Sequence, residues 1–225
     1  MARRPSSSER TLVLATANRA KARELRALLG GIPYRVLDLT DFPSLALPAE
    51  GAVSYSENAL LKARAVAAAT GMLALADDSG IEVDALDGGP GVLSARYGGE
   101  RLDDEARCAL MLRALRDVSP ERRTARYRCV VALRAPNDRE ATVEGVVEGV
   151  ILDGPRGNGG FGYDPIFYHR ALGATFAEVT PEAKHAVSHR GQAMARARRI
   201  LQAWAGDETR DRDRSNAAPS PPEGE

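Results

Sequence analysis

The stretch TLVLATANRAKARELRALLG, residues 11–30, decides the fold class. It opens with a short apolar run, TLVLAT, which is typical of a buried strand. The KARELRALLG that follows places Leu25, Leu28 and Leu29 at helical spacing and ends at Gly30, a common helix stop. A strand, a short turn and a helix therefore begin the fold, as they do in α/β proteins.

The later segments add both helices and strands. Ser54 and Glu57 form an S-x-x-E capping box for a helix that ends at Thr70. MLALAD and IEVDAL are two strand candidates, which the turn-forming DDSG interrupts. We further expect a helix over 103–117, an antiparallel hairpin in which TARYRCVVALRA and EATVEGVVEGVIL flank PND, and helices that begin at Thr180 and Ser188. This mixture of parallel-type and hairpin connections predicts an α/β fold with a mixed central β-sheet flanked by helices.

Length and composition predict a single enzyme-like domain. The chain has 225 residues, of which 44% are hydrophobic and 28% charged, as in ordinary soluble globular proteins. We place the domain at 10–205 and expect two disordered ends, 1–9 and 206–225. Both ends are polar and charged and carry too little apolar surface to offset the entropy of ordering.

Charge and cysteine content exclude several classes of protein. Lys and Arg together number 31, as do Asp and Glu, so no overall positive field attracts nucleic acid. The sequence has no apolar run of membrane-spanning length, and its opening MARRPSSSER lacks the apolar stretch of a secretory signal. Cys108 and Cys129 lie in a helix pattern and a strand pattern, so we expect two buried free thiols and a reducing compartment. These features predict a cytoplasmic protein that binds neither nucleic acid nor membrane.

The junction TANRAK, residues 16–21, is a candidate anion site. Backbone N–H groups at a helix start lack intrahelical partners, and the helix dipole is positive there. Arg19, Lys21 and Arg23 add positive charge to the same turn, which a bound phosphate would offset. A solvated basic face partly matched by Glu24 is the alternative at this point.

The segment ADDSG, residues 76–80, is a candidate magnesium site. Carboxylates are the ligands that Mg²⁺ prefers, and it uses one or two of them together with substrate phosphates. Strand alternation sends Asp77 and Asp78 to opposite faces, so only one of them points into a given cleft. The alternative is an Asx turn. Ser79 is a poor nucleophile candidate because no G-x-S-x-G elbow surrounds it.

Two further segments carry possible binding groups. GGFGYDPIF, residues 159–167, combines flexible glycines, an aromatic face for stacking on a planar ring and Asp164; its alternative is a turn whose aromatics fill the core. EAKHAVSHRG, residues 182–191, supplies the donors Lys184, His189 and Arg190. The three histidines have no ligand spacing, which argues against zinc.

Five strings in one order resemble a known family. TANRAK, SENALLKA, ADDSGIEVDALDGGPGVLSARYGG, GGFGYDPIF and SHRGQA, within residues 11–203, are similar to the inosine triphosphate, or non-canonical purine NTP (dITP/XTP), pyrophosphatases. The resemblance implies a two-lobed α/β homodimer with a cleft between the lobes. It also implies hydrolysis of ITP, dITP and XTP between the α- and β-phosphates, which gives the nucleoside monophosphate and pyrophosphate and sanitises the nucleotide pool.

The resemblance also assigns roles by position. Asp78 would bind Mg²⁺ and accept a proton from the attacking water. Glu50 is the candidate second metal ligand, although the family often has two consecutive glutamates where this chain has Ala49 and Glu50; otherwise the metal has one fewer protein ligand. The substrate would contact Thr16, Ala17, Asn18, Arg19, Ala20, Lys21, Ser79, Phe161, Gly162, Tyr163, Asp164, Lys184, His189 and Arg190.

Base selection follows from hydrogen-bond chemistry at C6 of the purine. Donors around His189 and Arg190 match a 6-oxo group and would be left unpaired by the 6-amino group of adenine. Guanine also has a 6-oxo group, so these donors do not explain its rejection. Two alternatives are a pyrophosphatase of other modified nucleotides, as in the similar Maf-like group, and a non-catalytic nucleotide sensor in which Asp78 only helps to bind metal.

Overall fold

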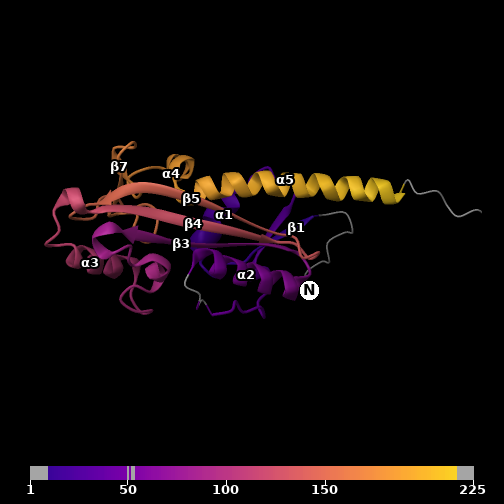
Figure 1. Ribbon diagram of the computed structural model, residues 1–225, viewed down its shortest axis with the longest axis horizontal. Coiled ribbons are helices and arrows are strands. Elements are labelled where there is room, and N and C mark those ends of the chain that lie inside the picture. Colours follow the sequence, from indigo (N-terminus) through magenta and orange to yellow (C-terminus); the bar gives the residue numbers. More distant parts are fainter. Residues whose placement is uncertain (1–9, 50, 52–53, 217–225) are drawn as a thin grey trace, which may run out of the picture.

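A single mixed sheet forms the centre of the protein (Figure 1). The computed structural model describes residues 10–49, 51 and 54–216. The strand order is β2-β1-β3-β4-β5-β6-β7; β1 pairs in parallel with β2 and β3, and the other neighbours pair antiparallel. The strands are β1 (Thr11–Leu14), β2 (Arg35–Asp38), β3 (Leu73–Val83), β4 (Thr124–Arg134), β5 (Glu140–Ile151), β6 (Phe167–His169) and β7 (Ala174–Thr175). The expected mixed sheet and the β4–β5 hairpin are confirmed.

Helices cover both sides of this sheet, with α5 along one side and α2 on the other (Figure 1). The α-helices are α1 (Arg19–Leu28), α2 (Tyr55–Thr70), α3 (Asp104–Ala114), α4 (Pro181–Val187) and α5 (His189–Asn216), and a 3₁₀ segment η3 spans Gly91–Arg96. Short polar side chains begin these helices as expected: Ser54, Asp103, Thr180 and Ser188 each accept a hydrogen bond from a backbone N–H in the first turn. Among the described residues, no helix is both long and apolar enough to cross a bilayer.

The core has separate parts, which give the protein two lobes. Leu25 of α1 packs with Leu12 and with α5 in one cluster, and α2 packs on the opposite side of β1 and β3 in another. A third cluster joins α3, through Met111, to the far halves of β3, β4 and β5 and to Phe167. The parallel end of the sheet and the hairpin end therefore have separate cores.

The expected break at DDSG is wrong, because β3 is one continuous strand. Residues Ala74–Val83 pair with β4 without interruption, which holds the turn-forming sequence extended. β1 pairs only with Leu73–Leu75 of β3. From Asp77 onward, side chains instead of a neighbouring strand lie along this edge of β3. Lys62 Nζ donates to the Asp77 carbonyl at 2.8 Å. The acidic pair thus lies in the middle of a strand, at an edge left open by a shorter neighbour.

The segment after Gly206 also differs from expectation where the structure describes it. α5 continues to Asn216 instead of ending at 205. Arg10 donates to the Ala205 carbonyl at 2.8 Å, and Arg139 pairs with Asp207 at 2.9 Å, so contacts with the domain support this part of the helix. Residues 1–9 and 217–225, the remainder of the expected disordered ends, lie outside the described residues.

Candidate active site

A cavity of about 350 Å³ lies beside the open edge of β3. Lys21 of α1 and Asp78 of β3 both line it. Of the predicted site residues, Arg19 and Ala20 do not line it, and Glu50 lies outside the described residues. The cavity is lined by Thr16, Ala17, Asn18, Lys21, Leu47, Lys62, Asp78, Ser79, Gly80, Val92, Ser94, Ala95, Asp104, Arg107, Tyr127, Phe161, Gly162, Tyr163, Asp164, Lys184, His189 and Arg190.

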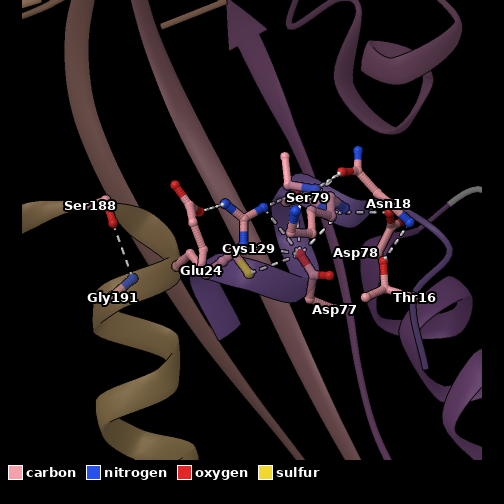
Figure 2. A network of polar contacts seen from close by, with 12 residues as sticks. Thr16, Asn18, Glu24, Asp77, Asp78, Ser79, Cys129, Ser188 and Gly191 are labelled. Atoms are coloured by element: carbon pink, nitrogen blue, oxygen red, sulfur yellow. Dashed lines mark hydrogen bonds and ion pairs between the residues drawn. The ribbon is translucent and has the colours of Figure 1, made fainter. Parts of the chain in front are cut away.

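The start of α1 forms one end of this cavity. Asn18 caps the helix, because its Oδ1 accepts from the backbone N–H groups of Ala20 at 2.9 Å and Lys21 at 3.1 Å. Thr16 Oγ1 accepts in turn from the Asn18 N–H at 3.2 Å (Figure 2). The cap already uses two N–H groups of the first turn, so an anion at this end depends more on the Lys21 ammonium than on the helix backbone.

Asp78 presents its carboxylate to the cavity in a fixed orientation. Oδ2 accepts from Asn58 Nδ2 at 3.0 Å, and Oδ1 accepts from the Ser79 N–H at 3.0 Å. Lys62 Nζ lies 3.9 Å from Oδ1. These contacts fix the rotamer of a carboxylate that lines the cavity while remaining 4% exposed.

Asp77 points to the other face of the strand, as alternation predicts, and is wholly buried. Its Oδ2 lies 3.3 Å from Lys21 Nζ and 3.1 Å from Arg190 Nη2. Figure 2 shows it between β3 and the thiol of Cys129, whose Sγ is 3.9 Å away. Burial alone would raise the pKa of Asp77, but Lys21 and Arg190 outweigh it, so the pKa lies below its ordinary value. Asp77 therefore positions cations and is not exposed to a ligand.

Buried ion pairs continue from Asp77 to the other end of the cavity. Arg190 Nη1 lies 2.6 Å from Glu24, and Lys184 Nζ lies 2.8 Å from Glu24 and 2.6 Å from Asp164. Burial acts to raise the pKa of Glu24, but Arg190 and Lys184 bring that pKa below its ordinary value. Burial dominates at Asp164, whose pKa is raised despite Lys184. Glu24 therefore pairs with Lys184 and Arg190 and is not matched to Arg19 and Arg23, which are exposed.

The glycine-aromatic loop turns tightly around Asp164. Its Oδ2 accepts from the Phe161 N–H at 2.9 Å. Gly160 has φ +73°, and a Cβ at that position would lie 2.1 Å from the same oxygen, so only glycine fits. The Phe161 ring lines the cavity with Lys184 Nζ 4.9 Å from its centroid. The core-filling alternative holds for the fully buried Phe167 but not for Phe161.

His189 lies at the start of α5 and stacks on Tyr127 at 4.6 Å between centroids. Burial and then the neighbouring Arg190 hold the pKa of His189 well below its ordinary value, so the imidazole is neutral near pH 7. Its buried Nδ1 has no hydrogen-bond partner among the described residues. A neutral ring in the cavity wall can donate or accept according to its tautomer.

Comparison with known proteins identifies the family. The Ham1 family model matches residues 12–200. The chain belongs to the Ham1 family. It is 52% identical over 197 residues to the dITP/XTP pyrophosphatase of Geobacter sulfurreducens, covering 88% of this chain and 98% of that protein. It is 50% identical over 193 residues to the dITP/XTP pyrophosphatase of Thermus thermophilus, covering 86% and 91%.

Solved Ham1 structures share the fold. The HAM1 protein from Coxiella burnetii is 41% identical with a TM-score of 0.79, covering 86% of this chain and 99% of that one. The Staphylococcus aureus Ham1 protein is 36% identical with a TM-score of 0.75, covering 88% and 100%.

Several cavity residues of this Ham1 chain were not predicted from sequence. Lys62 lies in the middle of the alanine-rich helix α2, on its buried side. A lysine among buried alanines is a sequence pattern that indicates a functional cation. Ser94 Oγ accepts from the Ile81 N–H at 2.9 Å and lies on η3, for which no local pattern was recognised. Tyr127, Asp104 and Arg107 reach the cavity only because β4 and α3 pack beside the aromatic loop.

The carboxylates at the cavity fit a magnesium ion that is shared with substrate. The described residues contain no group of three or more His, Cys, Asp or Glu side chains that would hold a metal by themselves. Asp78 supplies one carboxylate next to cationic groups suited to phosphates, which is the arrangement in which Mg²⁺ uses one or two protein ligands. The cysteines cannot assist, because Cys108 and Cys129 are buried.

Proposed function

We propose that this Ham1 chain hydrolyses ITP, dITP and XTP to the nucleoside monophosphate and pyrophosphate and so removes them from the nucleotide pool. The observation that carries the proposal is the single cavity that Lys21, Asp78 and Phe161 share. It offers a cation suited to phosphate, a carboxylate and a stacking ring within one cavity. The two relatives described above, named dITP/XTP pyrophosphatases and about half identical in sequence, support this substrate class.

In this proposal the phosphates lie at the α1 end of the cavity. The ammonium groups of Lys21 and Lys62 bind them there and neutralise the charge that grows on departing pyrophosphate. Asp78 accepts the proton of the water that attacks the α-phosphorus, and Asn58 holds its carboxylate in place. Asp78 would also hold Mg²⁺, which supplies further charge neutralisation when bound.

The base lies at the other end, against Phe161. Its 6-oxo group accepts a hydrogen bond from the wall that contains Lys184 and His189. Arg190 directs Nε and Nη2 to Asp77 and Nη1 to Glu24, so it acts mainly by holding those carboxylates. Thr16, Ala17, Asn18, Ser79, Gly162, Tyr163 and Asp164 complete the proposed contacts.

The cellular compartment and the kind of partner are proposed from the cysteines and the net charge. Two buried thiols suit the reducing cytoplasm, and the balanced charge suits a small nucleotide better than a nucleic acid. A homodimer is proposed from the family resemblance.

A panel of nucleoside triphosphates tests the proposal. With Mg²⁺ present, ITP, dITP and XTP should release pyrophosphate much faster than ATP or GTP. A purified sample that releases none from any of the three contradicts the function. Faster release from pyrimidine or methylated nucleotides supports the Maf-like alternative.

A further inference from the structure

Arg107 lines the cavity but has no role in the proposal above. It lies in the first turns of α3, and its side chain is 11% exposed. Nε is buried and has no hydrogen-bond partner among the described residues. The other nitrogens have weak contacts: Nη1 is 3.6 Å from Asp104, and Nη2 is 3.4 Å from the Gly99 carbonyl. A buried guanidinium with an unpaired donor is unfavourable unless a ligand supplies an acceptor.

Its surroundings place Arg107 at the base end of the cavity. One turn earlier on α3, Asp104 Oδ2 accepts from the Gly162 N–H at 2.7 Å. The next residue, Cys108, contacts the Gly162 carbonyl at 3.4 Å. Helix α3 is therefore hydrogen-bonded directly to the aromatic loop, whereas Lys21 lies on α1, whose Leu25 belongs to the separate core of the other lobe. Arg107 therefore lines the base end of the cavity and not the phosphate end.

The chemistry of guanidinium selects among purines at such a position. The guanidinium group has only N–H donors and no hydrogen-bond acceptor. Non-canonical and canonical purines differ at positions 2 and 6 by oxo groups, which accept, and amino groups, which donate. Lys184 and His189 supply donors for position 6 from the α4–α5 side of the cavity, so the α3 side is free to read position 2.

We propose that Arg107 donates from Nε to the 2-oxo group of xanthine and disfavours the 2-amino group of guanine. This inference rests on the proposed function. It assigns a residue to the discrimination between xanthine and guanine, which share the 6-oxo group and differ at position 2. Hypoxanthine, which has only hydrogen at position 2, makes neither the favourable nor the unfavourable contact. Arg107 is then a specificity residue for XTP over GTP.

Arg107→Gln and Arg107→Lys test the inference, with Arg113→Gln on the exposed side of the same helix as the control. The kcat/KM values for XTP, ITP and GTP are measured for all four proteins. Arg107→Gln should lower the XTP value by about 10- to 100-fold, the range for a hydrogen bond to a charged group. ITP should change less than about threefold, and the ratio of XTP to GTP should fall. Arg107→Lys keeps the charge but lacks Nε and should lose most of the same preference.

Binding of the monophosphates supplies a readout that does not need turnover. Calorimetric Kd values for XMP, IMP and GMP should show the same loss for XMP alone in Arg107→Gln. An equal fall for all three triphosphates would mean that Arg107 serves the phosphates and would overturn the inference, as would an unchanged XTP to GTP ratio. A wild-type protein that cleaves none of the triphosphates contradicts the proposed function instead, and the monophosphate affinities still decide the role of Arg107.

Discussion

Asp77 on β3 and Arg190 on α5 form an ion pair of 3.1 Å in which neither side chain is more than 2% exposed. The pair connects the two ends of the cavity, because Asp77 also holds Lys21 and Arg190 also holds Glu24. Figure 2 shows Glu24 and Asp77, the two carboxylates with which Arg190 pairs. Side-chain positions at both ends of the cavity therefore depend on one buried network.

Asp77→Asn should destabilise the fold strongly. It removes the buried carboxylate that Lys21 and Arg190 share and leaves Arg190 with Glu24 alone. Removing one partner of a buried ion pair typically lowers the free energy of unfolding by about 3–5 kcal/mol. Urea denaturation measures this change. Asp117→Asn, which breaks a surface pair with Arg116, is the control and should change the value by less than about 0.5 kcal/mol. Equal effects of the two substitutions would contradict a structural role for the network.

Stability should also fall in acid through Glu24. Its folded-state pKa lies below the ordinary 4.5, so the carboxylate contributes stability above pH 4.5 that is lost as the pH falls through the folded value. In Glu24→Gln, the drop in unfolding free energy between pH 7 and pH 3 should be smaller than in the wild type. Glu182→Gln, at an exposed position of α4, is the matched control. A drop of wild-type size in Glu24→Gln would show that the ion pairs contribute little.

Gly160→Ala should damage the base pocket more than the fold. Its Cβ would lie 2.1 Å from Asp164 Oδ2, which also accepts from Phe161 and Lys184. Gly173 has φ +66°, and a Cβ at that position would have no atom within 4 Å, so Gly173→Ala carries the backbone strain without the clash. Affinity for IMP, measured by calorimetry, should fall at least tenfold more in Gly160→Ala than in Gly173→Ala. Similar affinities in both variants would remove Asp164 from the pocket's architecture.

Asp78→Asn should lower turnover strongly and preserve binding. The amide cannot take a proton from water, and the loss should reach about 10²- to 10⁴-fold in kcat. IMP binding should remain within a few fold of the wild type, since the base end is untouched. Full activity in this variant would show that Asp78 is not the proton acceptor and that another group takes the proton.

Local sequence patterns predicted the elements well because their signals are short-range. The cap at Ser54, the hairpin around PND and the helix starts at Thr180 and Ser188 depend on neighbours within a few residues. The continuity of β3 was missed because DDSG has turn chemistry, and only the long pairing with β4 overrides it.

The site was predictable where residues already carried a chemical pattern, such as the acidic pair and the aromatic loop. Strand alternation alone did not indicate which aspartate faces the cavity; the family resemblance selected Asp78, which lines it. That choice depends on β1 ending at Leu14 and on Lys21 and Arg190 reaching Asp77 from two helices. Arg107 and Tyr127 were missed for the same reason, since tertiary packing alone brings α3 and β4 to the pocket.

The most direct test of the central claim is the position of oxygen from water in the products. Turnover of ITP in water enriched in oxygen-18 with Mg²⁺, followed by mass spectrometry, identifies the phosphorus that is attacked. The proposed function predicts one labelled oxygen in IMP and none in pyrophosphate, because water activated by Asp78 would attack the α-phosphorus. Label in pyrophosphate, or release of inorganic phosphate with IDP, would contradict the account.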